Sequence, residues 1–326
     1  MGQGKLQSGG LIVNYRCPAA CGHCMYGSGN GAAPGYMTYQ DATRICASLK
    51  ALGCGGLHIG GGEPFLNVTG LAAAVDAIIE SGISLDYVET NAAWITLDNK
   101  RDLKTLNEAF GGKKPAVMVS VDPFHIEFIP LNKPLALIGL LRENGFPYFI
   151  WQERYVNVLS KLDWTRTYGR GELMKIFGCD IVGSCAKEYG LGYNGRALNL
   201  LRLDPNNSRG RAGKYIRKEP CPNLKRPGHF HADYFGRYIP PGCTGIGVLL
   251  EDFNGPLDAK RYPTLTRLLA GGTALLYEYA LGLGFADGGD FVSECDVCFK
   301  VKQFLNKTDG AGHPDLHPAE FYSQDY

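Results

Sequence analysis

Eleven cysteines, an odd number, stand out in this chain of 326 residues. Three of them form a C-x3-C-x2-C motif at Cys17, Cys21 and Cys24, and Cys295 and Cys298 form a C-x2-C motif. The apolar stretch near the N-terminus is too short for a signal peptide. In a reducing compartment, clustered cysteines are typical of metal ligands rather than disulfides. We therefore expect a cytoplasmic protein with two thiolate-based metal sites.

The N-terminal motif favours an iron–sulfur cluster, because thiolates are soft ligands suited to such clusters and to zinc. Three thiolates on one loop can hold three irons of a [4Fe–4S] cluster and leave the fourth iron open. A structural zinc site needs a fourth protein ligand, which His23 could supply. The C-terminal set could hold either a closed cluster or zinc, and His229 or His231 could replace one of its cysteines. That set consists of Cys221, Cys243, Cys295 and Cys298.

Composition excludes several classes of protein. Hydrophobic residues make up 45% of the chain, enough to bury a full core. The 33 basic and 32 acidic residues leave a net charge of +1, which gives no general attraction to nucleic acid. The basic stretch 204–228 is interpreted as a solvated linker. No apolar run is long enough to span a membrane.

Short apolar runs alternate with stretches of helical periodicity along the first 200 residues. This order predicts the α/β class, with a parallel sheet that closes partly or fully into a barrel and with helices outside it. Functional residues are then expected at the carboxyl ends of the strands. The expected strands are 11–15, 57–59, 84–90, 116–121, 147–152 and 197–201, and the expected helices are 38–52, 68–80, 98–109 and 134–144.

The N-terminal motif, with Tyr26 two residues after its last cysteine, resembles that of the radical S-adenosylmethionine (SAM) superfamily. The GGGEP segment at 60–64 resembles the family's GGE motif. The resemblance covers roughly residues 11–200 and implies a partial (β/α)6 barrel. It also implies that SAM caps the open iron of a [4Fe–4S] cluster. The reduced cluster then cleaves SAM to a 5′-deoxyadenosyl radical, which abstracts a hydrogen atom from the substrate.

The same resemblance implies the residues that bind SAM. Glu63 would hold the amino group, together with the backbone of the preceding glycines. Strand-end polar groups would contact the ribose and carboxylate, although capping of the strand ends is an alternative reading for them. Tyr26 would touch adenine through its backbone, and Arg196 would face the cofactor or form an ion pair. The expected set is Tyr26, Gly61, Gly62, Glu63, Asn91, Ser120, Asp122 and Arg196.

Residues 231–243 resemble the β-hairpin of the SPASM/twitch extensions that follow many radical SAM barrels. Four cysteines in this order suit the shorter twitch form, which holds one auxiliary [4Fe–4S] cluster. We expect a radical SAM barrel over 1–203, an α+β twitch-like domain over 204–306 and a polar, frayed tail over 307–326.

A closed auxiliary cluster favours a one-electron acceptor, and hence oxidation or cross-linking of a small-molecule or peptide substrate. An external flavodoxin- or ferredoxin-type donor would supply electrons. His125 and Glu127, after the fourth strand, are the candidate catalytic bases, with Arg154, Tyr155 and His58 as weaker ones. The chain begins close to its first strand, which argues against a leader-peptide domain and a cobalamin domain.

Two other functions stay open from the sequence. A peptide epimerase or maturase would need a hydrogen-atom donor, for which Cys179 and Cys185 are the candidates. A non-catalytic iron–sulfur electron carrier would need only the cysteines. The GGGEP segment and the polar strand ends would then have no function.

Overall fold

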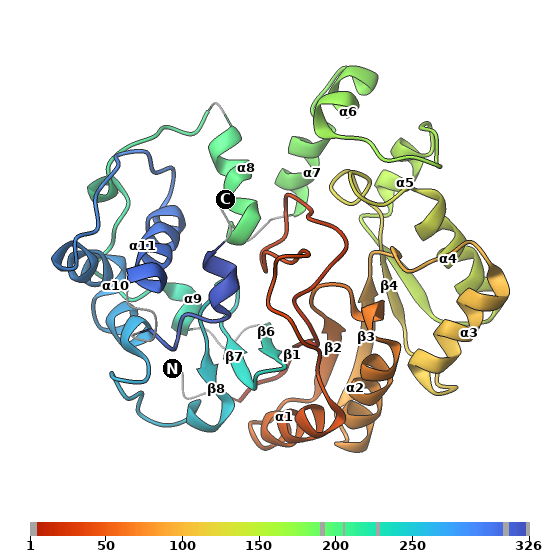
Figure 1. Ribbon diagram of the computed structural model, residues 1–326, viewed down its shortest axis with the longest axis horizontal. Helices are drawn as coiled ribbons and strands as arrows, with labels where there is room; N and C mark the ends of the chain where they lie inside the picture. Colours follow the sequence, from red (N-terminus) through yellow and green to blue (C-terminus); the bar gives the residue numbers. More distant parts are fainter. Residues whose placement is uncertain (1–4, 190–192, 205, 226–228, 309–312, 324–326) are drawn as a thin grey trace.

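A single eight-stranded sheet runs through the computed structural model, which describes residues 5–189, 193–204, 206–225, 229–308 and 313–323 (Figure 1). The strand order is β5-β4-β3-β2-β1-β6-β7-β8, with β1 to β6 parallel and β7 and β8 antiparallel. The strands are β1 (Ser8–Ile12), β2 (Gly56–Gly60), β3 (Ser84–Thr90), β4 (Val117–Ser120), β5 (Tyr148–Trp151), β6 (Phe230–Asp233), β7 (Arg237–Ile239) and β8 (Val248–Leu249). The predicted α/β class is confirmed.

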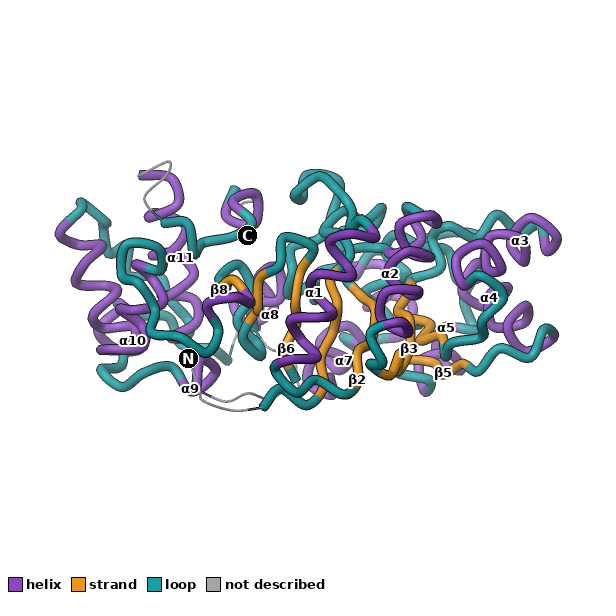
Figure 2. The backbone as a smooth tube through the Cα atoms, turned by 90° about the horizontal axis from the view of Figure 1, so that it is seen from below, coloured by secondary structure: helices purple, strands orange, loops and turns teal. Residues whose placement is uncertain are grey.

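Helices cover the outside of the curved parallel sheet, as the alternating pattern predicts (Figures 1 and 2). Polar side chains begin three of them, because a side-chain oxygen satisfies free amides of the first turn. Thr38, Asn67 and Asp98 are these caps. The helices are α1 (Tyr39–Ala51), α2 (Val68–Glu80), α3 (Asn99–Phe110), α4 (Asn132–Glu143), α5 (Arg154–Leu159), α6 (Arg170–Phe177) and α7 (Ile181–Tyr189).

The sixth barrel strand differs from the prediction. The apolar run 197–201, expected as a strand, belongs to the 3₁₀ turn η2 (Gly195–Ala197) and helix α8 (Leu198–Leu203). A short apolar run suits a helix or a strand equally, so periodicity could not decide. The parallel sheet instead continues on the other side of β1, where β6 pairs with residues 9–12.

Two glycines allow β1 to lie between these neighbours. A Cβ on Gly9 would lie 2.7 Å from the Phe230 ring, and one on Gly10 would lie 2.4 Å from the rings of both His58 and His231. Separations this short are not tolerated between non-bonded atoms, so side chains here would push β2 and β6 away.

The C-terminal part contains the predicted hairpin, because β6 and β7 pair through a tight turn at Gly236. Its helices are α9 (Pro222–Lys225), α10 (Pro263–Gly282) and α11 (Glu294–Thr308). The sheet is continuous from the barrel into this part, and the boundary at 204 stays a prediction. Within the described residues, no helix is both long and apolar enough to cross a membrane.

The end of the chain packs into the core, contrary to the expectation of a frayed tail. Asp315, Phe321 and Tyr322 are buried, and the Tyr322 hydroxyl donates a hydrogen bond of 2.5 Å to the Gly245 carbonyl. The predictions for this tail and for the basic stretch 204–228 concern in part residues 205, 226–228, 309–312 and 324–326, which lie outside the described residues.

Candidate functional site

A cavity of about 440 Å³ opens at the carboxyl ends of the parallel strands. Its volume is in the range of small-molecule sites. Residues directly after β2 and β3, and the last residues of β4 and β5, form part of its wall, as expected for a barrel of this kind. They are Gly61, Gly62, Asn91, Ser120 and Trp151.

The loop after β1 brings Cys17, Cys21 and Cys24 to this cavity. The first two are buried and the third is half-buried. The Cys17 sulfur accepts hydrogen bonds from the Asn91 side-chain amide at 3.2 Å and from the Ala19 amide at 3.4 Å. Burial raises the pKa of Cys17, so that the thiol keeps its proton until a metal replaces it.

The GGGEP turn binds the backbone that leads directly into the cysteine loop. The Gly62 amide donates to the backbone carbonyl of Asn14 at 2.9 Å, and the Glu63 amide donates to the carbonyl of Arg16 at 2.9 Å. The Asn14 side chain returns a hydrogen bond to the Glu63 carbonyl. A Cβ on Gly62 would lie 1.8 Å from the Arg16 carbonyl oxygen, one residue before Cys17. Glycine is therefore required here by close approach of two backbones.

Replacing Gly62 with alanine is expected to displace the cysteine loop. Overpacking at so close a contact should lower the free energy of unfolding by about 3 kcal/mol. The reconstituted variant should also lose about four irons per chain, because one [4Fe–4S] site is distorted. Chemical denaturation and iron analysis measure both effects. Gly139→Ala is the control, since a Cβ there meets nothing within 4 Å.

Glu63 is placed differently from the prediction. It is fully buried and does not line the cavity. Its carboxylate accepts hydrogen bonds from the Thr90 hydroxyl, the Asn91 amide and the Phe65 amide, at 2.9, 2.9 and 3.1 Å. Burial raises its pKa to about 7, although these bonds act in the opposite direction. In this structure Glu63 fixes the end of β3 rather than reaching into the cavity.

The other residues expected to bind SAM divide into two groups. Tyr26, Gly61, Gly62, Asn91, Ser120 and Arg196 line the cavity. Asp122 does not line it: its carboxylate accepts from the His125 ring nitrogen Nδ1 at 2.7 Å and from the Phe124 and His125 amides at 2.9 and 3.0 Å. Asp122 therefore orients the His125 ring without lining the cavity itself.

Arg196 holds the cysteine loop from the opposite side. Its Nε donates to the Cys21 carbonyl at 3.0 Å, one Nη donates to the Ser28 carbonyl at 2.5 Å, and its amide donates to the Cys24 carbonyl at 3.1 Å. The preceding Gly195 has φ +54, and a Cβ there would lie 2.5 Å from the Met25 carbonyl oxygen. These contacts give Arg196 a positioning role.

Among the candidate bases, only His125 and His58 line the cavity. Glu127 is exposed on the outer side of its turn, so the structure does not bring it to the site. The Tyr155 hydroxyl donates to Glu188 at 3.2 Å and accepts from Arg154 at 3.0 Å, away from the cavity. Burial lowers the pKa of His125, but the charges of Asp122 and Cys21 and the hydrogen bonds to both together outweigh it, so the net shift is upward.

The cysteine loop fits a cluster better than a single ion. Within the described residues, the sets of three ligand atoms that lie within 4.8 Å of one another contain histidine and aspartate but no cysteine. Sulfurs around one tetrahedral zinc lie about 3.8 Å apart, given Zn–S bonds of about 2.3 Å. His23, the proposed fourth zinc ligand, stacks on Phe124 with ring centroids 4.5 Å apart and groups with Asp122 and His125 instead.

The four C-terminal cysteines converge at a second place, outside the cavity lining. The charges of Cys221, Cys243 and Cys295 all act on Cys298, whose pKa burial raises to about 12. The buried Lys302 ammonium lies 3.9 Å from the Cys243 sulfur. Burial lowers the pKa of Lys302, but the neighbouring thiolates outweigh it and the net shift is upward. A fixed positive charge therefore accompanies the four sulfurs.

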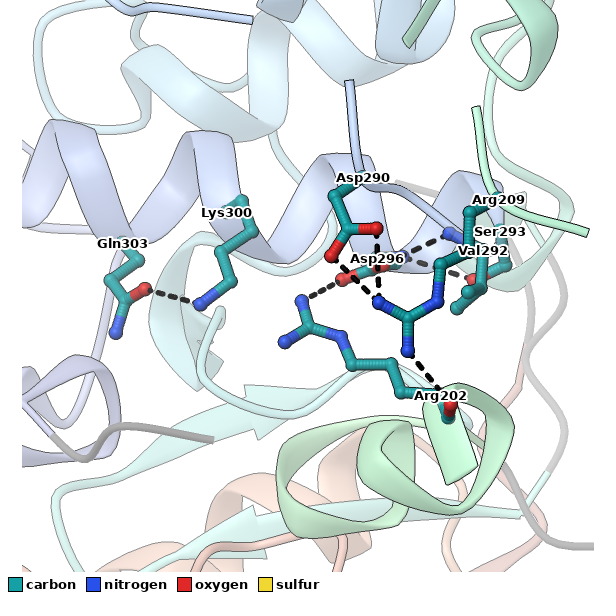
Figure 3. A network of polar contacts seen from close by, with 8 residues as sticks. All are labelled: Arg202, Arg209, Asp290, Val292, Ser293, Asp296, Lys300 and Gln303. Atoms are coloured by element: carbon teal, nitrogen blue, oxygen red, sulfur yellow. Dashed lines mark hydrogen bonds and ion pairs between the residues drawn. The ribbon is translucent and has the colours of Figure 1, made fainter. Parts of the chain in front are cut away.

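A polar network anchors the helix start that carries Cys295 and Cys298 (Figure 3). The fully buried Asp296 accepts from an Arg202 guanidinium nitrogen at 2.5 Å and from the Val292 amide at 3.1 Å. One guanidinium nitrogen of Arg209 donates to both carboxylate oxygens of Asp290, at 2.8 and 3.0 Å, and the other Nη donates to the Arg202 carbonyl. The segment after α8 thus holds the beginning of α11 in place.

His58, Glu89, His229 and His231 form one wall of the cavity, which the sequence does not predict. From the sequence, His58 is only a weaker candidate base, and the two later histidines are possible ligands of the auxiliary site. The structure places them in the barrel cavity instead. The H-x-H spacing at 229–231 was a usable signal, because residues two apart on a strand point to the same face.

Residues 6–110 match the family described as "4Fe-4S single cluster domain". No curated protein sequence matches the chain. Similar solved structures include anSMEcpe with bound AdoMet, at 15% identity, TM-score 0.41, 72% of this chain and 74% of that chain. SuiB of Streptococcus suis is similar at 17% identity, TM-score 0.35, 86% of this chain and 74% of that one. BtrN in complex with AdoMet and 2-DOIA is similar at 17% identity, TM-score 0.34, 78% of this chain and 76% of that one.

The family match covers β1 to α3 and includes the cysteine loop at the carboxyl ends of the parallel strands. The C-x3-C-x2-C motif lies within the matched range, and the glycine-rich turn that contacts this loop also belongs to it, which supports an iron–sulfur cluster site in this part of the chain. A C-terminal extension brings four further cysteines together.

Proposed function

We propose that the chain is a radical SAM enzyme that removes two electrons from its substrate, by dehydrogenation or by oxidative cross-linking. Cys17, Cys21 and Cys24 would hold the SAM-binding cluster, and Cys221, Cys243, Cys295 and Cys298 an auxiliary [4Fe–4S] cluster. When bound, these groups supply a hydrogen-abstracting radical and a one-electron acceptor, respectively. The remaining steps fall to side chains of the cavity.

The observation that carries the proposal is the convergence of four cysteines at a place separate from the cavity. Four thiolates complete the ligand set of a cluster and leave no iron for the substrate. Such a cluster can exchange electrons but cannot bind the substrate. The buried Lys302 ammonium at 3.9 Å from Cys243 stabilises added negative charge, which favours electron acceptance over donation.

The electrons and atoms of the oxidation balance as follows. One hydrogen atom of the substrate leaves in 5′-deoxyadenosine, and a second leaves as a proton to a base and an electron to the auxiliary site. SAM contributes the deoxyadenosyl group and leaves methionine. An external low-potential donor supplies one electron at the start, and one electron is released at the end. The two electrons therefore balance.

Glu89 is the base that the cavity geometry favours. Its side chain is about one-third exposed, at 34%, and it lines the cavity at the end of β3. His125, predicted from the sequence, is the second candidate: its Nδ1 is committed to Asp122, and it also hydrogen-bonds Cys21. The Glu89 carboxylate has a longer contact, 3.3 Å to His58 Nε2, and faces the cavity, where it can reach a substrate proton.

Replacing Glu89 with glutamine should lower product formation by about 100-fold, a typical effect of removing a general base. Formation of 5′-deoxyadenosine should persist, because the cysteine loop is untouched. His125→Gln is the comparison variant. If His125→Gln abolishes product while Glu89→Gln does not, the base is His125 and the assignment of Glu89 is wrong. Quantification of both products by mass spectrometry decides between them.

An epimerase requires a thiol that returns a hydrogen atom to the substrate. The positions of the two candidate thiols argue against this alternative. Cys179 is exposed, and Cys185 is buried beside Tyr155 with a pKa that burial raises to about 12. Neither lines the described cavity, whose only thiols in the described part of the chain are those of the N-terminal motif.

The proposed function is tested with anaerobically reconstituted enzyme, SAM, a reductant and candidate substrates taken from the products of neighbouring genes. We expect a product two mass units lighter than the substrate and one 5′-deoxyadenosine for each product molecule. A substrate deuterated at the reacting carbon should transfer deuterium to 5′-deoxyadenosine. A product of unchanged mass with an inverted stereocentre would instead show an epimerase.

A further inference from the structure

Three histidines from two strands meet on one wall of the cavity. His58 lies on β2, His231 on β6 and His229 directly before β6. One ring nitrogen of each lies within 4.8 Å of the others, close enough for small side-chain rotations to bring all three onto one ion. The His58 ring stacks on His229 with centroids 5.0 Å apart and meets His231 edge-on at 5.3 Å.

The surroundings keep these imidazoles in the form that binds metals. Burial lowers the pKa of His58 to about 3, and burial also lowers those of His229 and His231. His58 forms a hydrogen bond with the Gly9 backbone, which fixes one ring nitrogen and leaves the other as an acceptor. Histidines that ligate metals usually have such an outer partner.

The backbone of β1 is adapted to this arrangement. A Cβ on Gly10 would lie 2.4 Å from His58 Nε2 and 2.4 Å from a carbon of the His231 ring. The missing side chain therefore makes room for two imidazoles at once. On the far side, Glu89 approaches His58 Nε2 to 3.3 Å and adds a negative charge near the three rings.

We propose that His58, His229 and His231 bind a divalent transition-metal ion, with Zn²⁺ as the ion that three imidazoles suit best. Three imidazoles around zinc leave a fourth position open, as in catalytic zinc sites. Here that position faces the cavity, since all three histidines line it together with the N-terminal cysteines. Tyr26, two residues after Cys24, packs against His231 with ring centroids 5.3 Å apart.

The ion would hold an oxygen or nitrogen atom of the substrate at the wall of the cavity that the three histidines form. The expected substrate class is therefore a molecule with a metal-binding group, such as a carboxylate, amine or hydroxyl, near the carbon that reacts. This second step rests on the proposed function, whereas binding of the ion does not.

The test uses the reconstituted enzyme with its clusters in place, treated with a chelator and then titrated with Zn²⁺ against a chromophoric competitor. We expect one zinc per chain and only nitrogen and oxygen ligands in X-ray absorption spectra. His229→Ala should weaken zinc binding by more than about 100-fold, beyond the loss typical of outer partners. His229 is exposed, so this variant should fold normally.

His317→Ala is the matched control, because His317 packs on Phe235 away from the cavity and should leave zinc binding unchanged. His231→Gln is the second variant and should behave like His229→Ala. Equal zinc binding by wild type and both cavity variants, or sulfur ligands in the spectra, would overturn the proposal. Formation of 5′-deoxyadenosine by the wild type reports separately on the proposed function.

Discussion

Simultaneous replacement of Cys17, Cys21 and Cys24 with alanine is expected to abolish SAM cleavage. The wild type should carry about eight irons and eight sulfides, and the triple variant about four of each, because only the C-terminal set remains. The loss should be complete because all three sulfurs lie on one loop of the cavity and no other thiol lines it in the described residues. Iron analysis and anaerobic assay of 5′-deoxyadenosine measure the two effects.

Cys46→Ala and Cys54→Ala are the controls for this experiment. Both cysteines are buried in the core, and neither lines the cavity. Their iron content and SAM cleavage should stay at the wild-type level even if their stability falls. A triple variant that still produces 5′-deoxyadenosine would disprove the assignment of the cluster to this loop.

Replacing Cys295 and Cys298 with alanine is expected to separate SAM cleavage from product formation. The variant should lose the other four irons, since two of four ligands are gone. SAM cleavage should remain measurable, because these cysteines do not line the cavity. Product formation should fall far more than cleavage, because the acceptor of the second electron is missing. The ratio of 5′-deoxyadenosine to product is the measured quantity.

Cys179→Ala provides the control for the double variant, since this cysteine is exposed and lies outside both cysteine sets. Its ratio should match that of the wild type. If the C-terminal site of the purified protein holds zinc rather than iron, the role in electron transfer is wrong. An unchanged ratio in the double variant would also contradict that role.

The sequence predicted the elements whose local signals agree with their surroundings. The helix Val68–Glu80 and the strand Ser84–Thr90 have the predicted bounds, because a polar cap and a glycine-containing turn delimit them. The run 197–201 was assigned to the wrong element because four apolar residues around Asn199 carry no clear period. The pairing of β6 with β1 depends on contacts over 220 residues apart in sequence, about which local patterns say nothing.

The candidate site, too, was predicted where local signals suffice and was missed where long-range contacts decide. Cysteine spacing located two thiol sets, which the structure brings to two places. The position of Glu63, by contrast, depends on how β3 ends, because the Thr90 hydroxyl and the Asn91 amide donate hydrogen bonds to its carboxylate. The histidine cluster joins residue 58 to residues 229 and 231; the H-x-H spacing links the last two, but no local signal links His58 to them. Only the fold brings them onto one wall.

The pairing of β6 with β1 has a consequence for synthesis of the protein on the ribosome. β1 is translated well before its partner at Phe230–Asp233, with more than 200 residues between them. Until then, one edge of β1 has unpaired backbone groups, and such edges pair readily with other chains. A nascent chain that pauses before residue 230 is thus exposed to aggregation, and long-range pairing of this kind also slows folding.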